Sequence, residues 1–308
     1  MNTGSLSKAS NLYYATCLVV LSMMGLSFSC HSQVTDLARI EYTVIPQSNS
    51  ENSISRFRAL LNFPFKVSEG DYFILGMEYR NLDLDIEDPT PFPVDNLGRF
   101  QLIRFTMAYT FDMNKEWRFA AKTGAEVNSN FERSGIIGDD INYSGALFFI
   151  RDRSGKEVEK PSRLIVGLNY STNQGRPFPL PVINYFRQFH PKWSYSLGTP
   201  KTNLKFKMGR KQTLQGYLSL DGFFSNIQDN LDVPQSDGTL RTANNISMTQ
   251  ILGGLGYEYY ITKNLLLYLY GGHTVFNEIR LRDDDRNSLY RINEENTFFV
   301  RTGIKFKI

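Results

Sequence analysis

Arginine and lysine residues recur at every second position along several short stretches of the chain. Arg56 and Arg58 form one such pair, and Lys305 and Lys307 form another. Side chains two residues apart lie on the same face of a β-strand, so this spacing gathers positive charge on one side of a sheet. Guanidinium and ammonium groups placed in this way attract anions or pair with carboxylates. The set that we single out is Arg56, Arg58, Arg80, Arg104, Arg118, Lys122, Lys205, Lys207, Arg301, Lys305 and Lys307.

Residues for catalysis or for metal binding are scarce by comparison. The three histidines are His31 near the N-terminus, His190 in a predicted turn, and His273 after two glycines. Acidic residues cluster at 83–88 and at 283–285, but neither cluster has the glycine and the distal glutamate of an EF-hand loop. No zinc-ligand spacing, phosphate-binding glycine loop or dinucleotide fingerprint is present. We therefore expect no catalytic residues, no metal site and no cofactor.

The elements that must position the cations are strands that are apolar on one face only. A cation or a carboxylate, such as Arg58, Glu78 or Arg104, occupies the opposite face. The apolar faces of four consecutive segments are Phe57, Ala59, Leu61, Phe63 and Phe65; Phe73, Leu75, Met77 and Tyr79; Ile103, Phe105, Met107, Tyr109 and Phe111; and Trp117, Phe119, Ala121, Thr123 and Ala125. A soluble sandwich shows this pattern once or twice, whereas four in succession favour lipid outside and water inside.

Segments of about ten residues continue this pattern to the end of the chain, which is the length that a tilted strand needs to cross a bilayer. The expected strands lie near 38–45, 56–66, 73–80, 103–111, 117–126, 139–151, 162–172, 180–189, 192–199, 202–210, 212–223, 247–260, 264–279 and 297–308. The pattern predicts an all-β fold, a transmembrane antiparallel up-and-down barrel of about 14 strands. The number falls to 12 if the short segments at 192–210 are not two strands of the wall.

The connections between these strands are expected to be short on the periplasmic side and longer on the outside. The predicted inner turns are Ser68–Gly70, Asp112–Lys115, His190–Pro191 and Ile261–Lys263, and the predicted outer loops are 83–98, 129–138, 224–246 and 280–295. The inner connection at 152–161 is an exception, because it is long and highly charged. Aromatic residues on both sides of the inner turns, such as Trp117 and Trp193, are expected to form a girdle at the membrane surface.

The N-terminal segment indicates export. An apolar run from 18 to 28 ends in small residues, which is typical of a secretory signal peptide covering residues 1–32 and cleaved to leave Gln33 first. The alternative is lipidation at Cys30, although the preceding residues lack the usual aliphatic residue. The remainder, 33–308, is expected to be one domain without cysteine, since Cys17 and Cys30 both precede it. A formal net charge of +3 over 308 residues gives no reason to expect nucleic acid as a partner.

The last strand ends the chain in a pattern that resembles the insertion signal of outer-membrane β-barrel proteins. Arg301, Gly303, Phe306 and Ile308 carry this resemblance. It implies delivery to the barrel-assembly machinery and outer-membrane lipid as the surrounding medium. The whole mature region, through segments such as 38–42 and 76–80, also resembles outer-membrane β-barrel families of unknown function found in Bacteroidota-type bacteria, in the porin-like superfamily. This resemblance implies a location in the outer membrane of a Gram-negative cell and implies no established activity.

Two functions remain open at this level. Cations on the inner face predict a narrow water-filled lumen that prefers small polar or anionic solutes, as in a porin-like channel. The alternative is that the same residues pair across the lumen and fill it, which describes a structural or interaction barrel of the envelope or of a secretion complex. We expect no enzymatic activity. Outer-membrane phospholipases place a serine two residues after a histidine, and here Thr274 and Val275 follow His273. The oligomeric state cannot be read from the sequence.

Overall fold

The computed structural model describes residues 36–133, 135–154, 158–172 and 178–307. The predicted signal peptide (1–32) and the terminal Ile308 lie outside these residues. The strands are β1 (Asp36–Pro46), β2 (Ser53–Ser68), β3 (Asp71–Asp85), β4 (Arg99–Asp112), β5 (Trp117–Ser129), β6 (Ile141–Arg153), β7 (Ser162–Ser171), β8 (Leu180–His190), β9 (Trp193–Gly198), β10 (Lys201–Lys207), β11 (Gln212–Pro234), β12 (Leu240–Tyr260), β13 (Leu265–Arg282), β14 (Ser288–Asn293) and β15 (Phe298–Lys307). Two short 3-10 helices accompany them, η1 (Asp95–Leu97) and η2 (Gly138–Asp140).

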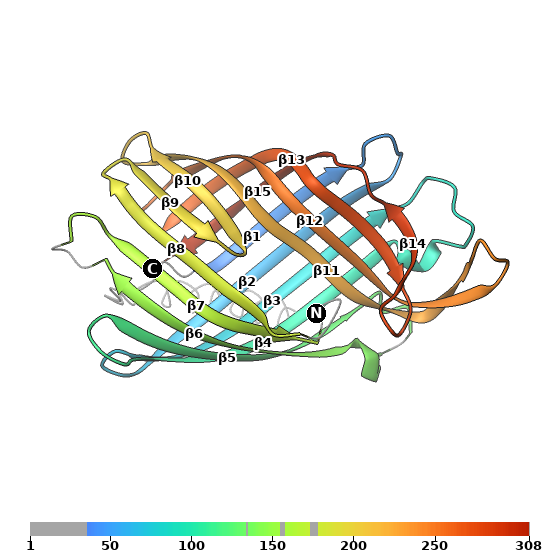
Figure 1. Cartoon of the computed structure of the whole chain (residues 1–308), viewed down its shortest axis with the longest axis horizontal. Coiled ribbons are helices and arrows are strands. Elements are labelled where there is room, and N and C mark those ends of the chain that lie inside the picture. The colour runs from blue at the N-terminus through green and yellow to red at the C-terminus, as the bar shows by residue number, and fades with distance from the viewer. Residues whose placement is uncertain (1–35, 134, 155–157, 173–177, 308) are drawn as a thin grey trace, which may run out of the picture. The chain divides into compact units, whose positions relative to one another are not determined.

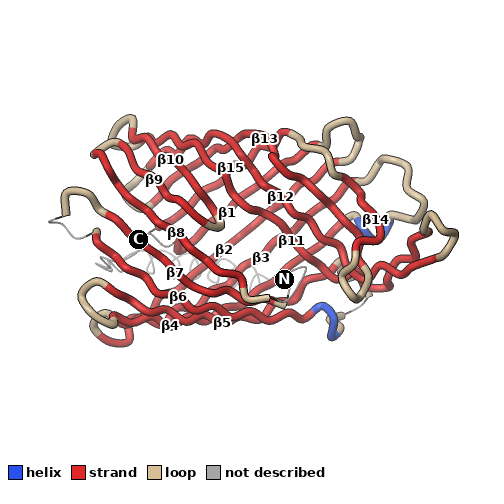
Figure 2. Tube along the Cα trace, viewed as in Figure 1, coloured by secondary structure: helices blue, strands red, loops and turns tan. Residues whose placement is uncertain are grey.

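The strands form one antiparallel sheet that closes on itself. Each strand from β1 to β13 pairs with its neighbours in the sequence, β13 pairs with β15, and β15 pairs with β1. Strand β14 lies beyond the edge of this wall, because it pairs only with the far end of β13. The wall therefore has fourteen strands, β1–β13 and β15, which confirms the predicted barrel and its predicted strand number. Figure 1 shows the strands inclined to the long axis, and Figure 2 shows that most of the described chain belongs to them.

The faces of the wall alternate as the sequence predicts. Phe105 and Met107 of β4 point outward and are more than half exposed, whereas Arg104 points to the interior. The same is true of β15, where Val300 is exposed and Phe299 is fully buried. Large apolar side chains face outward along most of the strands. No helix among the described residues is long and apolar enough to span a membrane.

The two ends of the barrel differ in their connections. One end, called here the turn end, carries the tight turns that join β2 to β3, β4 to β5, β8 to β9 and β12 to β13, and these coincide with the predicted inner turns. The other end, the loop end, carries the connections 86–98 and 130–140. The predicted loop 224–246 is wrong, since β11 and β12 continue through it and leave only a turn at 235–239. The predicted loop 280–295 is likewise shortened by β14.

The long strand β11 separates from β10 towards the loop end, stays paired with β12 and contacts β5. It pairs with β10 as far as Ser219, and Leu220 donates its backbone N–H to Pro200 O over 2.9 Å. Beyond this point Asn226 pairs with Ser129 in a parallel contact. The polar composition of this segment, which favours a loop when read alone, instead serves this contact between strands.

A group of buried polar residues, which we call the clasp, holds β11 to β5. It consists of Asn128, Ser129, Asn130, Asp140, Ser225, Asn226 and Gln228. Asp140 of η2 is fully buried and accepts hydrogen bonds from the side-chain amides of Asn226, at 2.8 Å, and Gln228, at 2.6 Å. Ser129 donates its hydroxyl to Asn226 O at 3.3 Å. Because each buried polar group finds a partner here, the contact is specific and avoids the cost of unpaired groups.

At the loop end, the clasp holds strands on opposite sides of the wall close to each other. Apolar side chains on the inner faces of β1–β4 and of β11–β13 pack into one buried cluster. Phe100 of β4 contacts Phe223 of β11 with ring centroids 5.9 Å apart, and Ile54 and Ile246 are among the most buried members. Between these strands an apolar core fills part of the loop end of the barrel.

Candidate functional site

One network of ion pairs runs along the inner faces of β2 to β5. The register of these strands places Arg58 opposite Arg80, and Arg104 between Glu78 and Glu126. Glu78 is buried and accepts hydrogen bonds from all three arginines, with Arg58 at 2.7 Å and Arg104 at 3.1 Å. Arg104 also pairs with Glu126. Three guanidinium groups thus share two carboxylates, so the network keeps a positive balance.

A second network crosses the lumen. Arg56 of β2 donates two hydrogen bonds to Asp221 of β11, at 2.8 and 2.6 Å. Arg301 of β15 donates to the same carboxylate at 2.5 Å and lies 3.7 Å from Glu41 of β1. Arg56 and Asp221 are 165 positions apart in the sequence, so their pairing depends on closure of the barrel. These contacts divide the interior at the level of Asp221.

A third group of cations lies against tyrosine rings nearer the turn end. Lys205 pairs with Glu258 at 3.0 Å, and Tyr270 donates its hydroxyl to the same carboxylate at 2.7 Å. Lys305 has its ammonium group 4.5 Å from the centre of the Tyr268 ring. Such contacts stabilise a cation electrostatically where carboxylates are few. The large side chains of this group narrow the lumen near the turn end.

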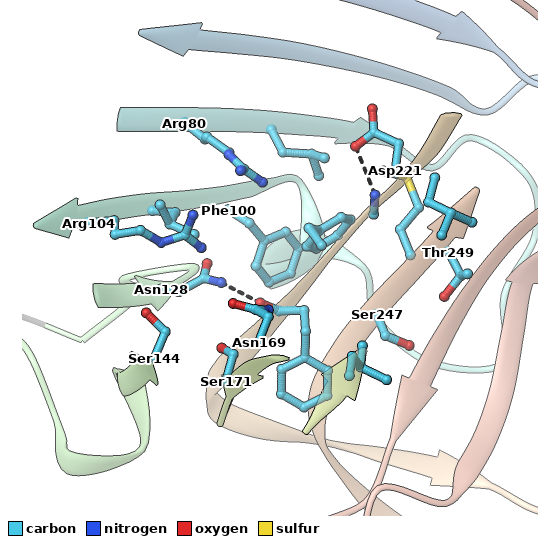
Figure 3. Close-up of a pocket in the computed structure, with 18 of the residues that line it drawn as sticks. Arg80, Phe100, Arg104, Asn128, Ser144, Asn169, Ser171, Asp221, Ser247 and Thr249 are labelled. Carbon is cyan, nitrogen blue, oxygen red and sulfur yellow. Dashed lines mark hydrogen bonds between the residues drawn. The ribbon is translucent and has the colours of Figure 1, made fainter. Parts of the chain in front are cut away.

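A cavity of about 1020 Å³ lies in the lumen beside these networks, because Arg56, Arg80 and Arg104 are among the residues that line it. Its walls come from β2–β8 and β11–β13, and Figure 3 shows Arg80 and Arg104 extending towards it from one side. The charged residues that line it are Arg56, Arg80, Arg104, Lys122, Arg282 and Asp221. Five cations therefore face one carboxylate. Lys122 makes no ion pair with any described residue, whereas Asp221 is bound to two arginines.

The remaining predicted cations lie near the turn end. Arg118 pairs with Asp112 at 2.7 Å, Lys307 lies 5.9 Å from the centre of the Tyr260 ring, and Lys207 is exposed. Glu116 lies in the β4–β5 turn.

That turn has its own ion pairs. Arg151 and Arg153 both bind Glu116, at 2.8 and 2.9 Å. Hydrogen bonds from Arg153 and Arg151 hold the pKa of the Glu116 carboxyl below its usual range.

Sequence reasoning missed several charged residues of the interior, among them Arg282, Glu41 and Lys201. Arg282 falls in a predicted outer loop, whereas Glu41 and Lys201 had a signal in the sequence. Glu41 alternates with Ile40 and Tyr42, and Lys201 shares the parity of Lys205 once β10 is started one residue earlier. Lys201 lies 4.4 Å from the centre of the Tyr217 ring.

The residues of the predicted insertion signal lie in β15 as far as the structure describes them. Phe306 faces outward, Gly303 pairs with Tyr268 and Glu41, and Ile308 lies outside the described residues. A Cβ at Gly303 would come within 2.5 Å of the Tyr268 hydroxyl, which donates to Glu41 at 2.6 Å. Glycine at this position therefore makes room for a buried hydrogen bond at the seam of the barrel.

The histidines and acidic clusters remain apart from the cavity. His190 accepts a hydrogen bond from the backbone N–H of Lys192 in its turn, and His273 lies against the Phe298 ring on the outer face. Among the described residues, no group of three or more His, Cys, Asp or Glu side chains has a geometry that could hold a metal ion.

Solved structures to which the chain is similar include a porin, an outer membrane channel and LpxR. The KdgM porin matches at 8% identity over 88% of this chain and 98% of that chain, with a TM-score of 0.36. The COG4313 outer membrane channel from Pseudomonas putida F1 matches at 8% identity over 92% and 100%, with a TM-score of 0.41. LpxR from Salmonella typhimurium matches at 6% identity over 88% and 100%, with a TM-score of 0.38.

No curated protein matches the sequence of this chain. One family model does match it. The model of a family described as a domain of unknown function, DUF6268, matches residues 77–307, which extend from the middle of β3 to the end of β15. The chain therefore belongs to the DUF6268 family.

Proposed function

We propose that this chain is an integral outer-membrane barrel that passes small polar or anionic solutes through a narrow, basic lumen. The proposal includes export by a signal peptide that is cleaved after residue 32. It places the barrel in the outer membrane of a Gram-negative bacterium of the Bacteroidota type, because the sequence resembles families found in such bacteria. It assigns the barrel no catalytic role. The outward apolar surface supports the membrane location, because a barrel in water would not expose so many large apolar side chains.

The observation that carries the proposal is the charge of the cavity. Arg56, Arg80, Arg104, Lys122 and Arg282 line it together with a single carboxylate. Pores lined by arginine and lysine favour anions, because the fixed positive charge raises the local anion concentration and opposes cations. The ion pairs across the lumen keep the passage narrow, so the solute must be small.

Conductance in planar lipid bilayers tests this proposal. In a KCl gradient we expect small single-channel steps and a reversal potential that indicates chloride preference. The substitution Lys122→Glu should lower the chloride-to-potassium permeability ratio by at least about twofold, because it reverses the one unpaired luminal charge of β5.

The matched control is Lys263→Glu, which makes the same charge change in the exposed β12–β13 turn. It should alter the ratio much less. Cation preference in the unaltered barrel would contradict the proposal.

A second candidate is a non-conducting barrel that acts in structure or interaction within the cell envelope. The apolar core at the loop end and the Arg56–Asp221–Arg301 contacts favour it, since both occupy part of the interior. Folded barrels that insert into bilayers without conducting would support this candidate over the channel.

We also propose that β15 serves as the insertion signal, with Arg301, Gly303, Phe306 and Ile308 as its determinants. Its alternation of exposed and buried residues, with Phe306 facing outward, supports recognition by the barrel-assembly machinery during insertion. Outer-membrane lipid is then the permanent partner of the outer surface.

A further inference from the structure

The cavity extends around a free edge of β11. Five consecutive residues of this strand, 220–224, line it, and consecutive side chains point to opposite faces of a strand. The neighbour β10 ends its pairing at Ser219, and the next contact on that side is Asn226 with Ser129 of β5. A cavity that touches both faces of β11 must pass through the interval between these two contacts.

On the outer side of this interval the cavity has an apolar rim. Phe178 just before β8 is 62% exposed, Leu180 in β8 is 46% exposed, and Leu220 in β11 is 53% exposed, although all three line the cavity. Leu180 belongs to the inward face of β8, because Ile183, an odd number of residues away, faces outward. An inward leucine that stays nearly half exposed borders an opening in the side of the wall.

On the inner side the same cavity is cationic. Arg80 and Arg104 reach it from β3 and β4, and Lys122 reaches it from β5. Both arginines already bind carboxylates, whereas Lys122 has no ion-pair partner among the described residues. Lys122 and Glu126 share one face of β5, so the lysine lies at the border of the ion-pair network.

We propose that the cavity binds a single-chain amphiphile with an anionic head group, admitted sideways past Phe178, Leu180 and Leu220. This inference rests on the proposed function and names the substrate class of the same lumen. The chain of the amphiphile lies among Phe148, Phe223 and the apolar rim, and its head group takes Lys122 as its counter-ion. The volume, about 1020 Å³, is at the upper end of the range of small-molecule sites, roughly 300–1,000 Å³.

Photo-crosslinking in lipid nanodiscs tests this inference. The probe is dodecanoate with a diazirine near the end of its chain, added to the barrel in discs of zwitterionic lipid, and labelled peptides are mapped by mass spectrometry. We expect labels on the cavity segments of β6–β8 and β11. Excess dodecanoate should remove them, whereas dodecyl maltoside, which has the same chain and a neutral head, should not.

Two pairs of variants separate head and chain recognition. Lys122→Gln should reduce cavity labelling by about tenfold, since a charge-assisted contact is lost. Lys207→Gln, on an exposed luminal lysine outside the cavity, should not change it. Ala146→Trp fills the cavity from β6 and should abolish the labels, while Ala125→Trp on the lipid face of β5 should leave them unchanged.

Several outcomes overturn the inference. Labels confined to the outward face, or equal competition by dodecyl maltoside, would show that the probe reports only the surrounding lipid. Protection by phosphatidylglycerol in the disc, equal to that by dodecanoate, would assign the cavity to a bilayer phospholipid instead. If the cavity segments are not labelled but the barrel still conducts anions, the bound amphiphile is refuted and the channel is not. Cavity labelling in a barrel that does not conduct would support the amphiphile and refute the channel.

Discussion

At the scale of single residues, Asp221 has the largest consequence for the interior. Its carboxylate binds Arg56, whose side chain is 5% exposed, and also Arg301. Removing one partner of a buried ion pair leaves the other charge uncompensated, which costs more than the pair contributes. The two arginines come from β2 and β15, so this one carboxylate ties three separate strands together.

Replacing Asp221 with asparagine should lower the free energy of unfolding by about 3 kcal/mol, because Arg56 and Arg301 lose their shared counter-ion. Urea titration of the barrel in lipid vesicles measures this change. The control is Asp229→Asn, whose partner Arg133 is as exposed as Asp229 itself. An exposed pair contributes little, so the control should stay within about 1 kcal/mol of the parent. Equal losses for both variants would contradict the central role of Asp221.

At the scale of elements, the clasp is a part of the fold that could not be predicted from the sequence. The wall strands were predictable, because an apolar outward side chain alternates locally with a polar or charged inward one, as in Phe105 beside Arg104. The extension of β11 was not predictable, because Asn226 and Gln228 are satisfied by Asp140, more than 80 positions away. The inward direction of Arg56 follows from alternation alone. Its pairing with Asp221 requires the closed barrel, and local pattern carries no information about it.

The clasp predicts a sharp difference between two neighbouring residues of η2. Asp140→Ala should remove the acceptor of Asn226 and Gln228, and the backbone of 223–234 should then exchange its amide hydrogens at least about tenfold faster. Hydrogen–deuterium exchange measured by mass spectrometry checks this. Asp139→Ala, on the exposed side of the same turn, is the control and should leave the exchange of this segment unchanged. Unaltered protection in Asp140→Ala would mean that the apolar cluster alone holds β11 in place.

At the scale of the whole molecule, the exposed apolar side chains divide between two media. Phe105 in the middle of β4 is 58% exposed, and Ile136 in the 130–140 connection is 60% exposed. Equal exposure gives equal cost in water for an introduced charge. If the wall stands in a bilayer, only Phe105 contacts hydrocarbon, and the two positions should respond very differently.

Phe105→Arg should therefore destabilise the inserted barrel by about 2–4 kcal/mol, which is the range for arginine near the middle of a bilayer. Ile136→Arg should change stability by less than about 0.5 kcal/mol, since it lies in a connection that water reaches. Equilibrium refolding into vesicles measures both. Similar small effects at the two positions would show that the outer surface of the wall is not covered by lipid.

The contact between β5 and β11 also imposes a rule of parity. The strands β11, β12, β13, β15 and β1–β5 form a smaller ring of nine within the wall of fourteen. Neighbours that alternate in direction cannot close an odd ring, so one pair must run parallel, and β5 with β11 is that pair. The five strands β6–β10 lie outside this smaller ring. If a hairpin were added to these five strands or lost from them, β11 would still run parallel to β5. The part of the wall formed by β6–β10 can therefore change in size by two strands at a time while the clasp is preserved.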